Sequence, residues 1–142
     1  MTIAEISLED AADILALEKE RIGDSLGPDE VAQSVLEQDY ISLVAKEDGK
    51  LVGYVLASVS VPEGEIYSIA VKQDQEGHGI GHQLLEAALA KLRERGVSRV
   101  LLEVEDGNER AYNLYLRAGF QEYRRRPNYY GSKDAICMEK RI

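Results

Sequence analysis

Apolar and polar residues alternate along the first half of the chain in a way that predicts strands. Four segments have the composition of β-strands, at residues 2–6, 40–47, 51–61 and 65–71. The turn sequences Asp48-Gly49-Lys50 and Pro62-Glu63-Gly64 separate the last three of them. Short turns of this composition join neighbouring strands, so these three are expected to form an antiparallel meander.

Two helices are expected between the first and second strands. Ser7 and Asp10 have the spacing of a capping box, which opens a helix. Apolar residues of that helix then fall near one face, at Ala11, Ile14, Leu15 and Ile22. Gly27-Pro28 indicates the start of a second helix, because proline is favoured at the first helical position. This helix is expected to run to about Gln38.

The second half of the chain has a different pattern. After a polar loop at 72–78, the apolar residues Ile80, Leu84, Leu85, Ala88 and Leu92 share one helical face. Gly96 is placed to end that helix. The apolar run at 100–104 is typical of a buried parallel strand.

Another helix and two strands complete the chain. Asn108 is a suitable cap for a helix with apolar positions at Ala111, Leu114, Tyr115 and Ala118, and Gly119 can end it. The last strands are expected at 120–126 and 132–141. Hairpins, a strand–helix–strand unit and two closing strands predict an α+β fold with a mixed sheet, as a single domain over residues 1–142.

Composition narrows the classes of function. The 142 residues are 44% hydrophobic and carry a formal net charge of −9. This charge argues against a nucleic-acid-binding protein and suits a cationic partner, although solubility alone explains it equally well. A disulfide framework is excluded because Cys137 is the only cysteine. The chain has neither the pattern of a signal peptide nor a membrane-spanning apolar run, so a cytoplasmic protein is expected.

The loop Glu76-Gly77-His78-Gly79-Ile80-Gly81 carries the first chemical signal. Glycines between a strand and a helix let backbone N–H groups approach an anion, which the helix dipole also attracts. The motif fits a phosphate-binding loop, and it also fits a tight turn that only needs glycine. The dinucleotide fingerprint fails in both registers, since His82 or Leu84 stands where its last glycine belongs. The loop also lacks the Gly-Lys-Ser/Thr ending of a P-loop.

Two further side chains are candidates for acid–base chemistry. Glu103 lies in an otherwise apolar strand, where burial and a neighbouring acid would make it a better base. Alternatively, it faces water at the strand end or pairs with Arg99. Tyr115 lies on the apolar face of its helix, where a phenol could donate a proton, although packing is the commoner role of such a residue.

In combination, these motifs resemble those of the GCN5-related N-acetyltransferases. The resemblance rests on Ile69-Ala70-Val71 with Gly79-Ile80-Gly81-His82-Gln83-Leu84-Leu85, and on Leu102-Glu103-Val104, Asn108, Leu114-Tyr115 and Ala118-Gly119-Phe120. The last third of the chain narrows the resemblance to one group of the family. Its segments Asn128-Tyr129-Tyr130 and Asp134-Ala135-Ile136-Cys137-Met138 are similar to those of the ribosomal-protein alanine N-acetyltransferases. These enzymes acetylate protein N-termini, and their fold is a mixed, mostly antiparallel twisted sheet flanked by about four helices.

The resemblance implies an enzyme that moves an acetyl group from acetyl-CoA to an amine, without a metal. Glu103 would be the general base, and Tyr115 would protonate the departing thiolate. The coenzyme would be bound by Ile69, Ala70, Val71, Gly77, His78, Gly79, Ile80, Gly81, His82 and Asn108. The acceptor, most simply a protein N-terminus, would lie against Tyr129 and Tyr130. The alternatives are a small-molecule or lysine acetyltransferase and a non-catalytic acyl-CoA-binding module, as a monomer or homodimer.

Three departures from the family pattern bear on these expectations. Glu76 and Gly77 stand where the family usually has Gln or Arg and then a basic residue, so an acid faces the expected diphosphate. The chain has no Trp near Asp24-Ser25-Leu26, and the segment Gly131-Ser132-Lys133 is short.

His78 and His82 lack a third metal ligand at suitable spacing. The run Arg124-Arg125-Arg126 is interpreted as a solvated face, with the 3′-phosphate of CoA or an acidic peptide as alternative partners.

Overall fold

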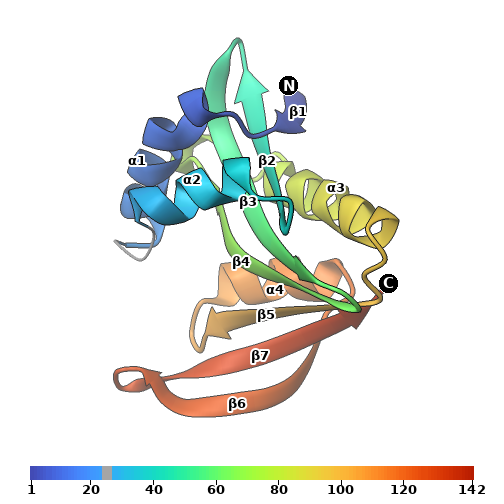
Figure 1. The fold of residues 1–142 in the computed structure, drawn as a ribbon. Helices are drawn as coiled ribbons and strands as arrows, with labels where there is room; N and C mark the ends of the chain where they lie inside the picture. Colours follow the sequence, from blue (N-terminus) through green and yellow to red (C-terminus); the bar gives the residue numbers. More distant parts are fainter. Residues whose placement is uncertain (24–26) are drawn as a thin grey trace.

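The protein forms one seven-stranded mixed sheet with helices on both faces (Figure 1). The computed structural model describes residues 1–23 and 27–142, except for the side chain of Tyr130. The strands are β1 (Thr2–Glu5), β2 (Tyr40–Glu47), β3 (Lys50–Ser60), β4 (Glu63–Val71), β5 (Arg99–Glu105), β6 (Gln121–Tyr130) and β7 (Lys133–Arg141). The helices are α1 (Ala11–Arg21), α2 (Pro28–Leu36), α3 (Ile80–Glu94) and α4 (Glu109–Arg117). This architecture confirms the expected α+β class.

The strand order is β1-β2-β3-β4-β5-β7-β6, and only β4 and β5 are parallel. That pairing covers Glu63–Glu65 against Arg99–Leu101, after which the two strands separate (Figure 1). Beyond this point β5 is paired on its other side, antiparallel to β7 along its whole length. The expectation of a buried parallel strand at 100–104 was therefore wrong for most of that segment.

A β-bulge in β4 contributes to this separation. Leu56 pairs with Ser68 and Ala57 pairs with Ile66, so Tyr67 has no partner of its own on β3. A bulge bends its strand and reverses the side to which later residues point. Ile69 consequently packs with the α3 and α4 side of the sheet, while Ala70 packs with the α1 and α2 side.

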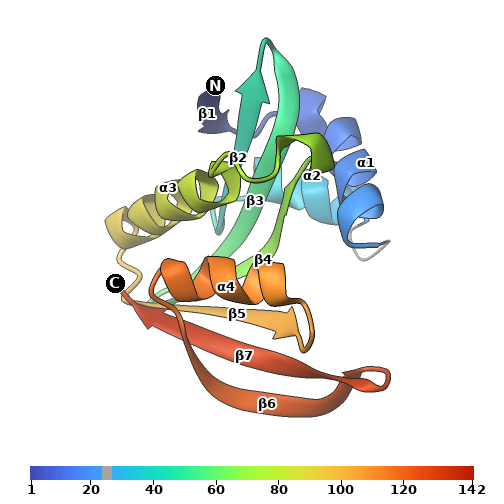
Figure 2. The ribbon, with the colours of Figure 1, turned by 180° about the vertical axis from the view of Figure 1, so that it is seen from behind.

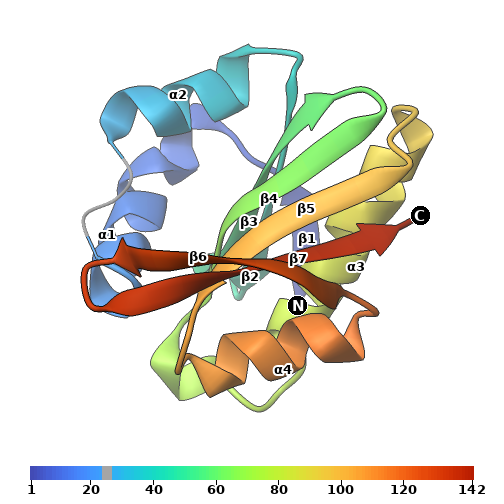
Figure 3. The same ribbon diagram turned by 90° about the horizontal axis from the view of Figure 1, so that it is seen from below.

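Two apolar cores hold the helices against the sheet. Helices α1 and α2 cover one face and α3 and α4 cover the other, as Figures 2 and 3 show from behind and from below. The smaller core joins α1 and α2 to the first strands through Ile14, Leu17, Val31, Val44, Leu51, Tyr54, Leu56 and Ala70. The larger core includes Leu84, Leu85, Leu92, Leu102, Tyr115, Phe120 and Met138. The ends of β4 and β5 that separate are therefore both held in place by packed cores.

The first helical segment begins as expected and ends differently. The Asp10 carboxylate accepts hydrogen bonds from the Ser7 N–H at 2.9 Å and from its hydroxyl at 3.2 Å, which confirms the capping box. Ile22 was expected on the buried face of α1, but its side chain is 53% exposed because the helix ends at Arg21. The second helix ends at Leu36, two residues before the predicted end.

Asp10 also forms a buried ion pair, which leads to a prediction about stability. Burial opposes ionisation, but Lys46 Nζ at 2.8 Å and the Ser7 hydrogen bonds more than offset it, so the pKa of Asp10 lies below its usual value. We expect Asp10→Asn to lower the free energy of unfolding by about 1–2 kcal/mol at pH 7, measured by urea denaturation.

The pH dependence of this effect has a definite sign. A folded-state pKa below the unfolded value stabilises the protein above about pH 4 and ceases to do so as the pH falls through the folded value. The difference between Asp10→Asn and wild type should therefore shrink in acid. Asp13→Asn, which removes an exposed acid from the same helix, should change stability by less than about 0.5 kcal/mol. Equal losses in both variants would contradict the role assigned to the ion pair.

The helices that follow β4 and β5 begin at Gly79 and at Asn108, and the second of these caps was predicted. Gly79 is the N-cap of α3 and has φ 78°, a conformation that favours glycine. The Asn108 side chain caps α4 by accepting a hydrogen bond from the Ala111 N–H at 3.3 Å. Within the described residues, every helix is too short or too polar to cross a membrane.

Candidate active site

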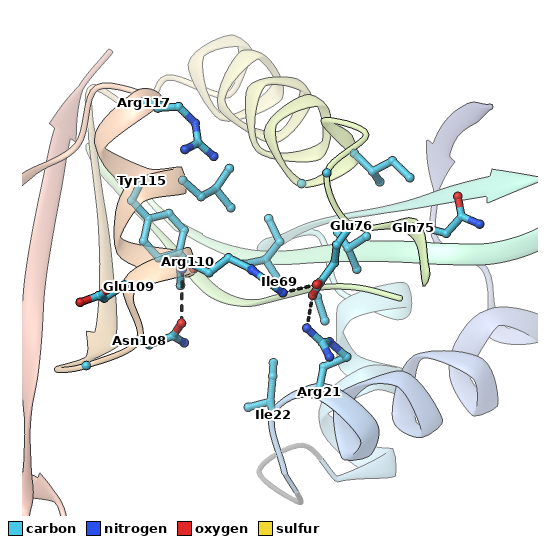
Figure 4. A pocket seen from close by; sticks show the side chains of 18 residues that line it. Arg21, Ile22, Ile69, Gln75, Glu76, Asn108, Glu109, Arg110, Tyr115 and Arg117 are labelled. Atoms are coloured by element: carbon cyan, nitrogen blue, oxygen red, sulfur yellow. Dashed lines mark hydrogen bonds and ion pairs between the residues drawn. The ribbon is translucent and has the colours of Figure 1, made fainter. Parts of the chain in front are cut away.

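A cavity of about 680 Å³ lies where β4 leaves β5 (Figure 4). One wall is β4 with the loop that follows it, and the other is α4. The end of α1 borders the cavity as well. The residues that line the cavity include Arg21, Ile69, Ala70, Val71, Glu76, Gly77, Ile80, Gly81, Asn108, Arg110, Leu114, Tyr115 and Arg117. Segments more than 90 residues apart in the sequence thus meet at one site.

The edge of β4 in this cavity is suited to an extended ligand. Among the described residues, β4 beyond Glu65 is paired with β3 on one side and with no strand on the β5 side. The backbone groups of Ile69, Ala70 and Val71 on that side are therefore free to bind a ligand as a strand would. These three residues, which the family resemblance implies as coenzyme contacts, line the cavity.

The glycine loop lies at the same end of the cavity. Gly77 and Gly79 both have positive φ, at 83° and 78°, which lets the chain turn sharply into α3. Gly77, Ile80 and Gly81 line the cavity. The helix N-terminus adds unpaired N–H groups and a positive dipole end, so the loop can hold a phosphate group.

The two histidines and Gly79 do not line the cavity itself. Gly79 acts instead through the conformation that it gives to the loop. His78 is exposed, and the Nδ1 atom of His82 is buried with no hydrogen-bond partner in the described part of the chain. No group of three or more potential metal-ligating side chains occurs among the described residues.

Asn108 and Tyr115 lie on the α4 wall. Asn108 uses its carbonyl oxygen as the helix cap and still lines the cavity. Tyr115 is 6% exposed and packs edge-on against Phe120, with ring centroids 6.1 Å apart. It also lines the cavity, so the packing role and the role in chemistry that the sequence left open are compatible.

Glu103 faces the opposite side of β5 from Tyr115. Leu102 and Val104 pack in the core with Tyr115, so Glu103 between them points to the other face. Its Oε1 atom lies 3.3 Å from Arg126 Nε, and the Cys137 thiol donates to it at 3.8 Å. The alternative partner considered for Glu103 was wrong, because Arg99 is paired with Glu63 and Glu139.

Comparison with known proteins identifies this arrangement. The family model described as acetyltransferase (GNAT) family matches residues 8–120. The chain belongs to the GNAT family. The [ribosomal protein bS18]-alanine N-acetyltransferase of Escherichia coli K12 is 36% identical over 103 residues, which cover 70% of each chain. A putative enzyme of the same name from Bacillus subtilis is 30% identical over 139 residues, 96% of this chain and 92% of its own.

Solved structures agree with the family assignment. The crystal structure of the ribosomal-protein-S18-alanine N-acetyltransferase from Escherichia coli has a TM-score of 0.90 at 29% identity, and the match covers 99% of this chain and 93% of that one. This protein is accordingly a GNAT acetyltransferase that uses acetyl-CoA, and the cavity beside β4 fits that cosubstrate. The expected fold, enzyme class and cosubstrate are confirmed.

A second acid accompanies Glu103 on the GNAT sheet, and the sequence reasoning missed it. Glu65 pairs with Leu101 across the β4–β5 contact, so its side chain shares a face with Glu103. Although Glu65 as a whole is exposed, desolvation of its carboxyl raises its pKa, and the charge of Glu103 raises it further. Only the strand register reveals this proximity, since the two residues are far apart in the sequence.

The predicted acceptor-binding tyrosines lie on the β6–β7 hairpin. The Arg126 guanidinium lies over the ring of Tyr129, 5.4 Å from its centroid, and this connects Tyr129 to Glu103 through Arg126. Tyr129 is 53% exposed. The side chain of Tyr130 lies outside the described part of the structure, as do Asp24-Ser25-Leu26, the segment where a Trp was expected.

The arginine run is only partly a solvated face. Arg125 binds Glu122 at 2.7 Å and Asp106 at 3.1 Å, which ties the hairpin to the end of β5. Arg126 is the member that reaches Glu103. The sequence alone could not predict the contact between Arg126 and Glu103, because that contact depends on how β6 pairs with β7.

Proposed function

We propose that this GNAT enzyme acetylates the N-terminal α-amine of a protein, as the names of its bS18-alanine relatives suggest. One observation of the structure supports this most: Glu103 and Tyr115 lie on opposite faces of β5 beside the gap between β4 and β5. An acceptor can then approach from the Glu103 side while acetyl-CoA lies on the Tyr115 side. Residues 1–142 would act as one N-acetyltransferase domain.

Glu103 would serve as the general base for the acceptor. An α-amine has a pKa of about 7.8, so at neutral pH most of it is the ammonium form and has no lone pair to attack with. Glu103 can accept that proton directly or through a water molecule. The acidic surface formed by Glu103 and Glu65 also favours binding of the ammonium ion.

The Arg126 guanidinium must move away from Glu103 before Glu103 can accept a proton from the acceptor. Its Nε atom contacts Glu103 at 3.3 Å but makes no well-aligned hydrogen bond there. Such a contact is weaker than an aligned, bidentate pair. We infer that the acceptor ammonium replaces the Arg126 guanidinium beside Glu103, with Tyr129 keeping the displaced arginine close by.

The donor side would be held by the residues that line the cavity. Acetyl-CoA supplies the acetyl thioester. Ile69, Ala70 and Val71 would bind its extended arm, the loop ending at Gly81 would hold its diphosphate, and Asn108 would contact it from α4. Tyr115 would donate its phenolic proton to the sulfur that leaves when the amine has attacked.

Tyr115→Phe tests the last role. We expect this variant to lower kcat by about 10-fold with little change in the Kd for acetyl-CoA, because the hydroxyl acts on the leaving sulfur and not on the bound thioester. The ring and its contact with Phe120 are kept, so the fold should be unaffected. An unchanged kcat with a weakened Kd would mean that Tyr115 only shapes the pocket.

A CoA-release assay across three acceptor classes tests the function. The panel is a peptide that begins with alanine, the same peptide with a blocked N-terminus and one lysine, and a polyamine. The proposal requires the first to have the highest kcat/KM. Preference for the lysine peptide or the polyamine would instead support the alternative acceptors, and CoA binding with no turnover on any of them would support a binding module. Cytoplasmic location and a monomer or homodimer stay predictions.

A further inference from the structure

The Glu76 carboxylate joins two arginines from distant parts of the chain. Oε1 is paired with Nη2 of Arg21, at the end of α1, and Oε2 is paired with Nη1 of Arg110, in the first turn of α4. The dashed lines in Figure 4 mark both pairs. One carboxylate therefore bridges α1, the loop after β4, and α4.

This bridge lies inside the donor site. Arg21, Glu76 and Arg110 all line the cavity, and Glu76 is the first residue of the glycine loop that leads into α3. The side chains of Arg21 and Glu76 are only 23% and 20% exposed, whereas Arg110 is 69% exposed. Two guanidinium groups thus converge beside a helix N-terminus, at the end of the cavity that carries the expected diphosphate-binding loop.

The pair of arginines is better suited to phosphate than to one carboxylate. Guanidinium groups bind phosphate oxygens through paired, charge-assisted hydrogen bonds, and a helix N-terminus favours the same charge. Glu76 neutralises one of their two positive charges, which leaves the group with a net charge of +1. A diphosphate carries two negative charges and more acceptor oxygens, so it can satisfy both arginines completely.

We propose that Arg21 and Arg110 bind the diphosphate of acetyl-CoA, and that Glu76 occupies them in the free enzyme until the diphosphate replaces it. Coenzyme binding is then an exchange of anions. The acid at position 76 weakens affinity by competing for the arginines, not merely by repelling the ligand. This inference rests on the use of acetyl-CoA and is independent of the identity of the acceptor.

Calorimetric Kd values for acetyl-CoA test the exchange. Arg21→Gln and Arg110→Gln should each weaken binding by about tenfold, because each removes a charge-assisted contact. Glu76→Gln should tighten binding by up to about tenfold, since both arginines are then released. In the Arg21→Gln/Arg110→Gln background, Glu76→Gln should have little further effect.

That last comparison separates exchange from simple repulsion. If Glu76 acted only as a negative charge near the diphosphate, Glu76→Gln would tighten binding equally in both backgrounds. Two controls remove a charge without touching the bridge: Asp74→Asn just before the glycine loop, and Arg93→Gln in the last turn of α3, at the far end from that loop. Neither control should change Kd by more than about twofold, and thermal melts should show every variant folded.

Two ligands identify which phosphate the arginines bind. With 3′-dephospho-CoA, the losses in the two arginine variants should persist, because the diphosphate is still present. With acetyl-pantetheine, which has no phosphate, they should disappear. Losses that vanish with 3′-dephospho-CoA would assign the arginines to the 3′-phosphate and overturn the diphosphate assignment. Arginine variants that bind acetyl-CoA as wild type does would overturn the proposal as a whole.

Discussion

Glu103→Gln is expected to lower kcat/KM for the amine acceptor by about 10²-fold or more at pH 7, the usual contribution of a positioned general base. Glutamine keeps the size of the side chain and cannot take a proton. The loss should become smaller as the pH rises past about 8, because the free amine is then abundant without help. Binding of acetyl-CoA should be unchanged, since Glu103 lies on the other face of β5 from the cavity wall formed by Tyr115.

Two neighbouring acids make this test specific. Glu105 lies on the same face of β5, two residues further along, and contacts Lys133 at 4.0 Å. Glu105→Gln should have nearly the wild-type rate. Glu65→Gln removes the acid that is electrostatically coupled to Glu103 and should have an intermediate effect at most. A wild-type rate and pH profile in Glu103→Gln, with a large loss in Glu65→Gln, would transfer the role of base to Glu65.

Gly79→Asp is expected to weaken acetyl-CoA binding by at least about 100-fold. Aspartate is accepted at a helix N-cap and tolerates a positive φ better than most residues, so α3 should still form. Its carboxylate would, however, stand at the N-terminus of α3 and compete for the N–H groups that we assign to the diphosphate. Calorimetry with acetyl-CoA measures the loss.

Gly49→Asp is a matched control for this substitution. Gly49 has the same φ of 78°, lies in the turn between β2 and β3, and has nothing within 4 Å of an added Cβ. Both variants therefore place an aspartate at the same positive φ and add the same charge, but only one places that charge beside the cavity. Equal effects on Kd would show that strain, and not competition for the anion site, is responsible.

The regular elements of this protein could be predicted well from its sequence. Apolar periodicity and turn residues located the helices and strands, and the capping pairs at Ser7–Asp10 and Asn108–Ala111 depend on spacing that is visible in the sequence. Ile22 was misplaced because periodicity alone does not say where α1 ends. The order of the strands was not predicted, because the family resemblance implied only a mixed, mostly antiparallel sheet and the pattern does not say which strands are neighbours.

The long-range contacts of the site could not be predicted in this way. Glu76 is 55 residues from Arg21 and 34 from Arg110, so nothing local connects them. The partner of Glu103 depends on the register of β6 against β7, which bulges interrupt on both sides of Arg126. The sequence supplied candidates for catalytic and binding residues, while their partners became clear only once the strands were placed.

The position of the acetyl group on a reacted peptide tests the central claim most directly. The peptide begins with alanine, contains one internal lysine and is incubated with the protein and acetyl-CoA. Tandem mass spectrometry then locates the modification. We expect acetylation of the alanine α-nitrogen, and loss of that product with Glu103→Gln. Acetylation confined to the lysine side chain, or an α-acetylated product formed equally well by Glu103→Gln, would contradict it.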